Sequence, residues 1–245
     1  MQCVVLAGGK GTRMLPLTQD RPKALLPVAG RPFADWQLDL LAAQGFTEIV
    51  YSVGHLGGMV RDFVGDGARW GVRVAWIDEG DELRGTGGAL RLALDAGRLR
   101  PDFAVVYGDS FLPVAIDPVR AAFVASGLPA LMTVYCNDGR FDTSNVRFEH
   151  DRVVAYRKGR PDPELRFIDY GLGWLTRDVI ADRVPADTVA DLATVYADLS
   201  AEGLLAGFEL HERFYEVGSP EGLEALERYL ASGSWPSSLA HQPRR

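Results

Sequence analysis

A short apolar strand that leads directly into a glycine-rich loop constrains this chain more than any other feature. Residues 2–6 form a β-branched apolar run, and the sequence continues as Leu6-Ala-Gly-Gly-Lys-Gly-Thr-Arg13. In a parallel sheet such a loop lies at the carboxyl end of its strand, where ligands bind. Glycines allow positive φ angles and let backbone amides approach a phosphate or a base edge closely. The sequence therefore predicts an α/β protein with a nucleotide-binding loop.

The spacing of the glycines excludes two common phosphate loops. The dinucleotide pattern GxGxxG would need glycine at Met14, and the Walker pattern would need serine or threonine where Gly11 follows Lys10. A plain strand-to-helix turn explains three glycines, a threonine and an arginine in this short run less well. The loop residues predicted to contact the nucleotide are Leu6, Ala7, Gly8, Gly9, Gly11, Thr12 and Arg13.

Strand-like and helical patterns alternate through the first half of the chain, which is typical of a mostly parallel sheet covered by helices. Beyond Asp109 the pattern changes to strands with few helices between them, which predicts mixed or antiparallel pairing. We expect an α/β fold, a single-domain Rossmann-like mixed, mostly parallel sheet flanked by helices, over residues 1–232, with a flexible tail at 233–245. The predicted strands cover residues 2–6, 48–53, 72–77, 103–107, 130–135, 145–148, 153–156 and 168–176, and the predicted helices cover 33–44, 56–64, a segment from Thr86, and 220–230.

Composition narrows the possible partners. The 245 residues are 47% hydrophobic and 24% charged, as in globular proteins, and the net charge of -7 would repel nucleic acid. Cys3 and Cys136 form neither a CxxC motif nor a Cys/His cluster, which argues against a zinc site. The apolar stretch Ala121–Tyr135 is too short to span a bilayer, and the first residues lack a signal-peptide pattern. We expect a cytoplasmic protein with no nucleic-acid or membrane partner. The sequence does not distinguish a monomer from a homodimer.

A lysine held between two prolines follows the glycine loop. Lys23 lies between Pro22 and Pro27, which are expected to hold this stretch extended and to present the ammonium group at a nearly constant position. Arg13 offers a planar fork for phosphate oxygens, whereas Lys23 offers a point charge. This division of roles is expected around a polyphosphate.

The segments LAGGKGTRM and PKALLPVAGRP together resemble the signature of the sugar-1-phosphate nucleotidyltransferases, which make nucleotide-diphosphate sugars. Further likeness comes from Gly85-Thr86-Gly-Gly, Gly108-Asp109 and the late segment 215–220, so the resemblance covers nearly the whole chain. It implies the nucleotide-diphospho-sugar transferase fold and a reaction that joins a nucleoside triphosphate to a sugar 1-phosphate and releases pyrophosphate. Arg13, Lys23 and Asp109 would be the catalytic residues.

Two carboxylates are predicted to hold Mg²⁺. Asp109 follows a hydrophobic strand at the carboxyl edge of the sheet, and magnesium prefers a few hard oxygen ligands together with substrate phosphates. An alternative is that Asp109 caps the next helix. The resemblance places a second metal carboxylate at Glu216, where the family has aspartate. Ser219-Pro220 also reads as the N-cap and first residue of the closing helix.

Base and sugar recognition follow from the resemblance. Gly85 and Thr86 would lie beside the nucleobase, and Glu79 upstream offers two acceptors to guanine, unless it belongs to a solvated acidic loop. We expect GTP, with UTP, CTP or dTTP as alternatives. The residues expected to bind the sugar phosphate are Asn145, Lys158, Asp169 and Gly171.

The family's Glu-Lys pair here reads Arg157-Lys158, and its asparagine before glycine is Asp169, so the acceptor sugar is expected to be unusual. D-glycero-D-manno-heptose 1-phosphate or mannose 1-phosphate is the expected substrate. A glycosyltransferase is a rival, although Gly108-Asp109-Ser110 lacks the second aspartate of a DxD metal motif. A non-catalytic nucleotide-sugar binding protein is the alternative from another class.

Overall fold

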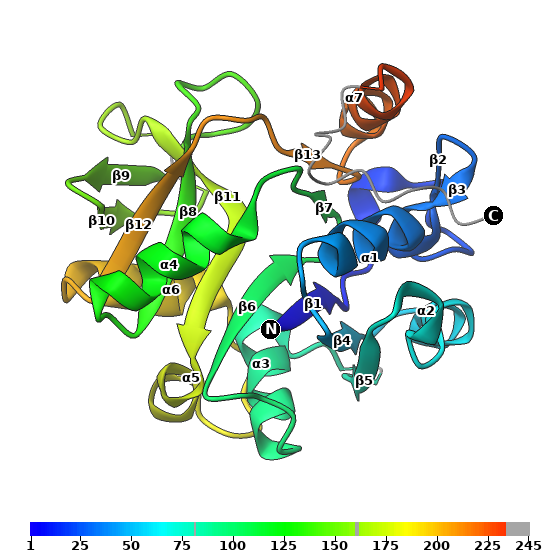
Figure 1. Cartoon of the computed structure of the whole chain (residues 1–245), viewed down its shortest axis with the longest axis horizontal. Coiled ribbons are helices and arrows are strands. Elements are labelled where there is room, and N and C mark those ends of the chain that lie inside the picture. The colour runs from blue at the N-terminus through cyan, green and yellow to red at the C-terminus, as the bar shows by residue number, and fades with distance from the viewer. Residues whose placement is uncertain (81, 160–161, 234–245) are drawn as a thin grey trace. The chain divides into compact units, whose positions relative to one another are not determined.

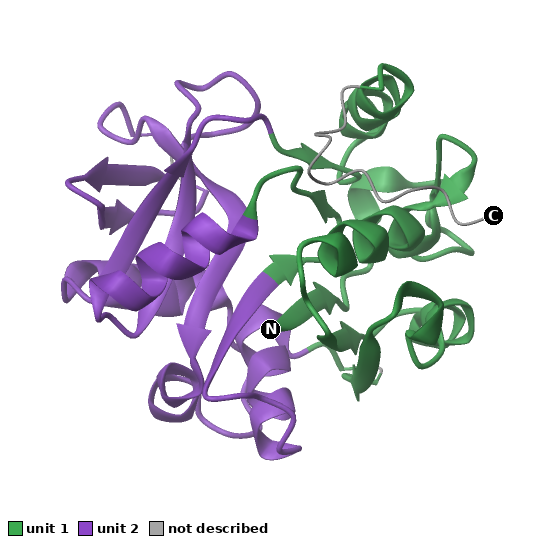
Figure 2. Cartoon of the chain, viewed as in Figure 1, with its two compact units in different colours: residues 1–83, 106–115, 214–245 green, residues 84–105, 116–213 purple. Residues whose placement is uncertain are grey.

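A computed structural model of the chain describes residues 1–80, 82–159 and 162–233 (Figure 1). The predicted tail at 233–245 lies outside the described residues except for Gly233. By its internal contacts the chain divides into two compact units, which Figure 2 colours separately. Unit 1 comprises residues 1–83, 106–115 and 214–245, and unit 2 comprises residues 84–105 and 116–213. The predicted domain boundaries stay a prediction.

Unit 1 is built on parallel strands in the order β5, β4, β1, β6. Strand β1 (Gln2–Ala7) pairs in parallel with β4 (Glu48–Val53), which pairs in parallel with β5 (Arg73–Asp78). Cys3, Val4 and Val5 are fully buried, as expected for a strand covered on both faces. Strand β6 (Asp102–Tyr107) is shared between the units, its last two residues belonging to unit 1.

Helices and short pairs complete unit 1. The helices are α1 (Phe33–Ala43), α2 (Gly57–Val64) and α7 (Pro220–Ala231), and the 3₁₀ turns are η1 (Thr12–Met14), η2 (Lys23–Leu25) and η3 (Ala68–Trp70). The short strands β2 (Pro27–Val28) and β3 (Arg31–Pro32) pair with each other, as do β7 (Ser110–Phe111) and β13 (Tyr215–Glu216). A buried cluster of Phe33, Phe111, Val217 and Leu226 joins α1, β7 and α7. Segments far apart in sequence thus share one core.

Unit 2 has mixed pairing, as the sequence predicted for this half. Strand β8 (Ala130–Cys136) is antiparallel to β11 (Phe167–Thr176) and parallel to β12 (Leu205–Leu210). Strand β10 (Arg152–Tyr156) is antiparallel to β12 and to β9 (Val146–Glu149). The predicted mixed α/β class is therefore confirmed.

Between the strands β8, β9, β10 and β11 the described residues form no helix, as the sequence predicted, but the helices before and after these strands were missed. Unit 2 contains α3 (Gly85–Asp95), which matches the helix predicted from Thr86. The helices that were not predicted are α4 (Ile116–Ser126), α5 (Arg177–Arg183) and α6 (Leu192–Ala201). The apolar stretch 121–135 is the end of α4, a turn at Gly127, and then β8. Its helical part was missed because α4 is short and its apolar side chains continue into an apolar strand. Among the described residues, no helix has the length and apolar character needed to cross a membrane.

Candidate active site

Gly11 is the residue of the glycine loop whose backbone conformation favours glycine. Gly11 has a φ of 65° at the start of η1, and a Cβ atom there would lie 3.1 Å from Lys23 Cγ. A Cβ atom on Gly8 would overlap the carboxylate of Glu79. Around Gly9 the space is open. The Thr18 hydroxyl donates to the Gly11 carbonyl at 2.9 Å and stabilises the turn.

Lys23 and Asp109 form an ion pair beside this loop. The distance between Nζ and Oδ2 is 2.9 Å, and the side chains are 17% and 25% exposed. Lys23 begins the 3₁₀ turn η2, so the predicted extended segment between the prolines is corrected. Proline restricts the residue before it. Leu26 before Pro27 is accordingly extended, while residues 23–25 remain free to turn.

The turn that carries Asp109 is held by backbone contacts and by one buried glutamine. The Gly108 amide donates to the Leu6 carbonyl at 2.8 Å, and a Cβ atom on Gly108 would lie 2.5 Å from Ala7 Cβ. Gln37 is 2% exposed, and its amide donates to the carbonyls of Tyr107 at 3.0 Å and Ser110 at 2.9 Å. Nothing in the sequence connects Gln37 to this turn, so it was not predicted.

Asp109 does not cap a helix. Residues 110–111 form β7, and α4 begins only at Ile116. The Asp109 carbonyl instead accepts the amide of Val217 at 2.8 Å, which brings the late motif alongside the turn. Strand β13 adds to this contact, because Glu216 pairs with Ser110.

Arg13 and Glu216 converge on Gly218. A Cβ atom at Gly218 would lie 3.2 Å from an Arg13 guanidinium nitrogen and 3.3 Å from Glu216 Oε1. The Ser219 hydroxyl accepts the Gly222 amide at 3.1 Å with Pro220 in the first turn, which confirms the predicted N-cap. Ser219 and Pro220 therefore start α7, whereas Glu216, which precedes them, places a carboxylate in the neighbourhood of Arg13.

The carboxylates in unit 1 fit a magnesium ion that takes most of its ligands from substrate and water. Among the described residues, no group of three or more His, Cys, Asp or Glu side chains could enclose a metal. The backbone segments that carry Asp109 and Glu216 lie side by side, through the contact of the Val217 amide with the Asp109 carbonyl and the pairing of β13 with β7. Magnesium keeps several waters and commonly uses one or two carboxylates plus phosphates. The donor set is therefore suitable.

Glu79 is not a freely solvated loop residue. It is partly buried, its amide donates to the Val53 carbonyl at 2.9 Å, and its carboxylate reaches Gly8. The acidic run therefore contains one side chain directed at the glycine loop. Its predicted role in base recognition stays a prediction.

The other predicted residues lie in unit 2. Gly85 has a φ of 73° and begins α3, and the Gly87 and Gly88 amides donate to the Ala190 carbonyl at 2.8 and 3.2 Å. The Thr86 hydroxyl donates to Asp191 Oδ1 at 2.9 Å and accepts the Leu192 amide at 2.8 Å. The start of α3 is thus tied to the start of α6.

The predicted sugar residues are connected with one another. Asn145 Oδ1 accepts the Asp169 amide and Asp169 Oδ1 accepts the Gly171 amide, each at 2.9 Å. Burial, together with the charge of Asp169, raises the pKa of Tyr156 and of Tyr196 well above the ordinary value, so both stay neutral hydrogen-bonding groups.

Lys158 contacts Asp191, a residue that the sequence did not single out. The distance between Nζ and Oδ2 is 3.0 Å. Burial acts to raise the pKa of Asp191, but hydrogen bonds from the Ala193 amide, Lys158 and Thr86 together lower it below its ordinary value. An aspartate before an apolar run is a helix N-cap signal, and α6 does begin at the next residue.

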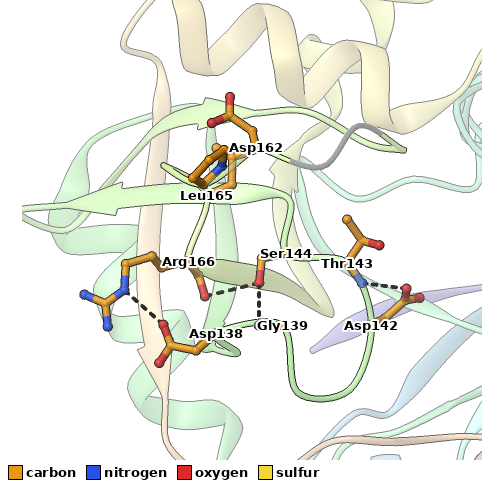
Figure 3. Close-up of a pocket in the computed structure, with 9 residues that line it drawn as sticks. Asp138, Gly139, Asp142, Thr143, Ser144, Asp162, Leu165 and Arg166 are labelled. Atoms are coloured by element: carbon orange, nitrogen blue, oxygen red, sulfur yellow. Dashed lines mark hydrogen bonds and ion pairs between the residues drawn. The ribbon is translucent and has the colours of Figure 1, made fainter.

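A hollow of about 670 Å³ in unit 2 lies apart from these predictions (Figure 3). Two of the three aspartates that line it, Asp138 and Asp162, are paired with Arg166 and Arg157 at 2.9 and 2.5 Å. No predicted site residue is among the described residues that line it. The lining residues are Asp138, Gly139, Asp142, Thr143, Ser144, Asp162, Pro163, Leu165 and Arg166.

Known proteins resemble this chain along its whole length. The N-acetylmuramate alpha-1-phosphate uridylyltransferase of Neisseria meningitidis serogroup B is 42% identical over 242 residues, which cover 96% of this chain and 100% of that protein. The mannose-1-phosphate guanylyltransferase of Mycobacterium tuberculosis is 32% identical over 242 residues, covering 97% of this chain and 66% of that longer protein.

A solved structure from Bacillus anthracis, assigned as a glucose-1-phosphate thymidylyltransferase, superimposes with a TM-score of 0.84 at 20% identity and covers 98% of each chain. At that identity the likeness shows the fold alone. Residues 2–140 match the family described as Nucleotidyl transferase. The chain therefore belongs to the Nucleotidyl transferase family and is an enzyme of the sugar-1-phosphate nucleotidyltransferase class.

Proposed function

We propose that this enzyme transfers a guanylyl group from GTP to a hexose or heptose 1-phosphate, with mannose 1-phosphate or D-glycero-D-manno-heptose 1-phosphate as the acceptor. The observation that carries the proposal is the Lys23–Asp109 ion pair beside the glycine loop. A partly buried cation and a carboxylate at the end of a parallel strand suit a triphosphate and its metal ion.

The acceptor phosphate oxygen attacks the α-phosphorus of GTP in line, and pyrophosphate leaves. Lys23 exchanges its contact with Asp109 for a phosphate oxygen, and Arg13 neutralises charge on the departing pyrophosphate. Asp109 and Glu216 are the residues that would hold Mg²⁺, which when bound supplies charge neutralisation and orientation of the triphosphate. Catalysis then consists of positioning and electrostatic stabilisation, with no covalent intermediate on the enzyme.

Glu79 supports guanine as the base. Its two carboxylate oxygens match the adjacent N1–H and amino donors of guanine. Uracil presents one N–H donor between two carbonyl acceptors, which a carboxylate would repel. The carboxylate is directed at Gly8, within the loop expected to hold the nucleotide.

UTP is a second candidate, because the Neisseria relative that matches over its whole length is a uridylyltransferase. The two are separated by incubating the enzyme with each of GTP, UTP, CTP and dTTP. The acceptors are mannose, D-glycero-D-manno-heptose, glucose and N-acetylmuramate 1-phosphates. Pyrophosphate release and mass spectrometry of the products are the readouts.

A GDP-sugar as the main product supports the proposal. A UDP-, CDP- or dTDP-sugar as the main product would show that the enzyme uses the corresponding triphosphate instead of GTP. No pyrophosphate from any pair contradicts the proposed function and supports a binding protein. Consumption of ready-made nucleotide sugars, with transfer to an acceptor, supports the glycosyltransferase rival.

A further inference from the structure

Asp191 links two segments that the predicted site needs. Its Oδ1 atom accepts the Thr86 hydroxyl at 2.9 Å and the Ala193 amide at 3.0 Å, while its Oδ2 atom accepts Lys158 Nζ at 3.0 Å. One carboxylate thus joins the first turn of α3, the loop after β10 and the N-terminus of α6. Each of these residues belongs to unit 2.

The Lys158–Asp191 contact contributes little to the stability of the fold. The two side chains are 60% and 48% exposed, and exposed ion pairs are weak. Asp191 itself is held in place, because it caps α6 and accepts the Thr86 hydroxyl. A restrained carboxylate can fix a flexible lysine, whose free side chain samples many rotamers.

We propose that Asp191 is a positioning residue that holds the Lys158 ammonium group ready for the phosphate of the sugar 1-phosphate. An ammonium group has three donors, so the contact with Asp191 leaves two for phosphate oxygens. The residue before Lys158 is an arginine, and the carboxylate partner of the lysine is instead Asp191, the N-cap of α6. This inference rests on the proposed function.

Asp191→Asn separates the charge contact from the structural roles. Asparagine caps helices about as well as aspartate. Its carbonyl still accepts from Thr86 and Ala193, whereas its amide places a donor against the Lys158 ammonium group. We therefore expect Asp191→Asn to keep the melting temperature of the native enzyme and to release Lys158.

The expected kinetic result is a rise of about tenfold in the KM for the sugar 1-phosphate, the scale of one charge-assisted contact. The kcat and the KM for the nucleoside triphosphate should change by less than about threefold. The assay uses GTP with mannose 1-phosphate, or the most productive pair of the panel above. Lys158→Ala should raise the same KM by at least as much.

The double variant tests whether Asp191 acts through Lys158. In the Lys158→Ala background, Asp191→Asn should have no further effect on the KM, which is the signature of two residues in one interaction. The control is Glu202→Gln at the other end of α6, which breaks the Arg183–Glu202 pair, with contacts of 2.8 and 2.6 Å, and should leave all kinetic constants unchanged.

A wild-type KM in Asp191→Asn, or full additivity with Lys158→Ala, would overturn the inference while wild-type turnover leaves the proposed function standing. The same KM increase in the Glu202→Gln control would show that loosening α6 in general causes the effect, and would also overturn it. Absence of turnover in the wild-type enzyme would instead remove the proposed function itself.

Discussion

In unit 1 the Lys23–Asp109 pair is only 17% and 25% exposed, whereas the Lys158–Asp191 pair in unit 2 is 60% and 48% exposed. The first pair is enclosed by backbone: Gly11 packs against the lysine stem, and Gly108 packs against Ala7. The second pair joins exposed loop and helix ends. Screening by solvent weakens the second pair far more than the first.

This difference has a consequence for function. Charges that stabilise a transition state must be held accurately in a partly dry environment, where they act strongly. Charges that bind the acceptor can be more exposed, because contacts to sugar hydroxyls and to the phosphate oxygens that do not attack tolerate water. We therefore expect substitutions in unit 1 to lower kcat and those in unit 2 to raise KM.

Lys23→Ala tests the unit 1 side of the comparison most directly. We expect turnover to fall by about 100- to 1000-fold, the usual loss when one preorganised charge donor is removed. Steady-state pyrophosphate release is the measurement. Arg21→Ala, an exposed cation two residues earlier, is the matched control and should keep near-normal turnover. Equal turnover in Lys23→Ala and wild type would sink the assigned role.

Gln37→Leu tests whether catalysis requires the hydrogen bonds by which Gln37 holds the turn that carries Asp109. Leucine cannot donate to the carbonyls of Tyr107 and Ser110, and losing such buried contacts costs about 1–3 kcal/mol in the free energy of unfolding. We also expect kcat to fall by about tenfold, because the Asp109 side chain loses its fixed position. Denaturant unfolding and kinetics measure the two effects.

Gln37→Glu sharpens this test, because its carboxyl group has the same shape but donates one hydrogen bond when protonated and none when ionised. Because burial favours the protonated form, the stability loss of Gln37→Glu should grow as the pH rises. Gln44→Leu at the C-terminus of α1 is the control for a glutamine on the same helix. A stability loss with unchanged kcat would show that the turn is structural only.

The sequence predicted much of unit 1 because local patterns specify it. The predicted strand at 48–53 coincides with β4, and the predicted helix at 33–44 coincides with α1 to within one residue. Glycine loop, lysine and aspartate were all identified from local motifs, and the structure brings Lys23 and Asp109 into contact. Short-range patterns are most informative where each strand is followed by its own helix or loop.

Contacts between distant segments could not be predicted. Gln37 meets Tyr107 across 70 positions of sequence, and Lys158 meets Asp191 across 33. Helix α6 was missed, so its N-cap aspartate had no context. A glutamine or an exposed aspartate has many uses, and only the folded chain shows which partner it has.

Glu79→Gln tests the base contact in unit 1. Glutamine presents one acceptor and one donor, which matches uracil or thymine better than guanine. We expect the ratio of kcat/KM for GTP to that for UTP to fall by about tenfold. With GTP the enzyme loses one hydrogen bond between the carboxylate and guanine, whereas with UTP it gains one hydrogen bond between the glutamine amide and a uracil carbonyl. Glu82→Gln, an exposed residue of the same acidic run, is the control. An unchanged ratio would show that Glu79 does not contact the base and has only a structural role beside Gly8.

Ser219→Ala tests whether the segment 215–220 divides into a part that carries charge, with Glu216, and a part that starts α7, with Ser219. Loss of the N-cap of α7 should lower the free energy of unfolding by about 1 kcal/mol, and Ser219→Asp should restore it, because aspartate also caps helices. Turnover should stay within about threefold of wild type, since the charges at Gly218 come from Arg13 and Glu216 rather than from Ser219. Thermal unfolding and pyrophosphate release are the measurements. If kcat falls by much more than stability predicts and Ser219→Asp does not restore it, the hydroxyl takes part in the chemistry, and the division between a helix-starting half and a charge-bearing half is wrong.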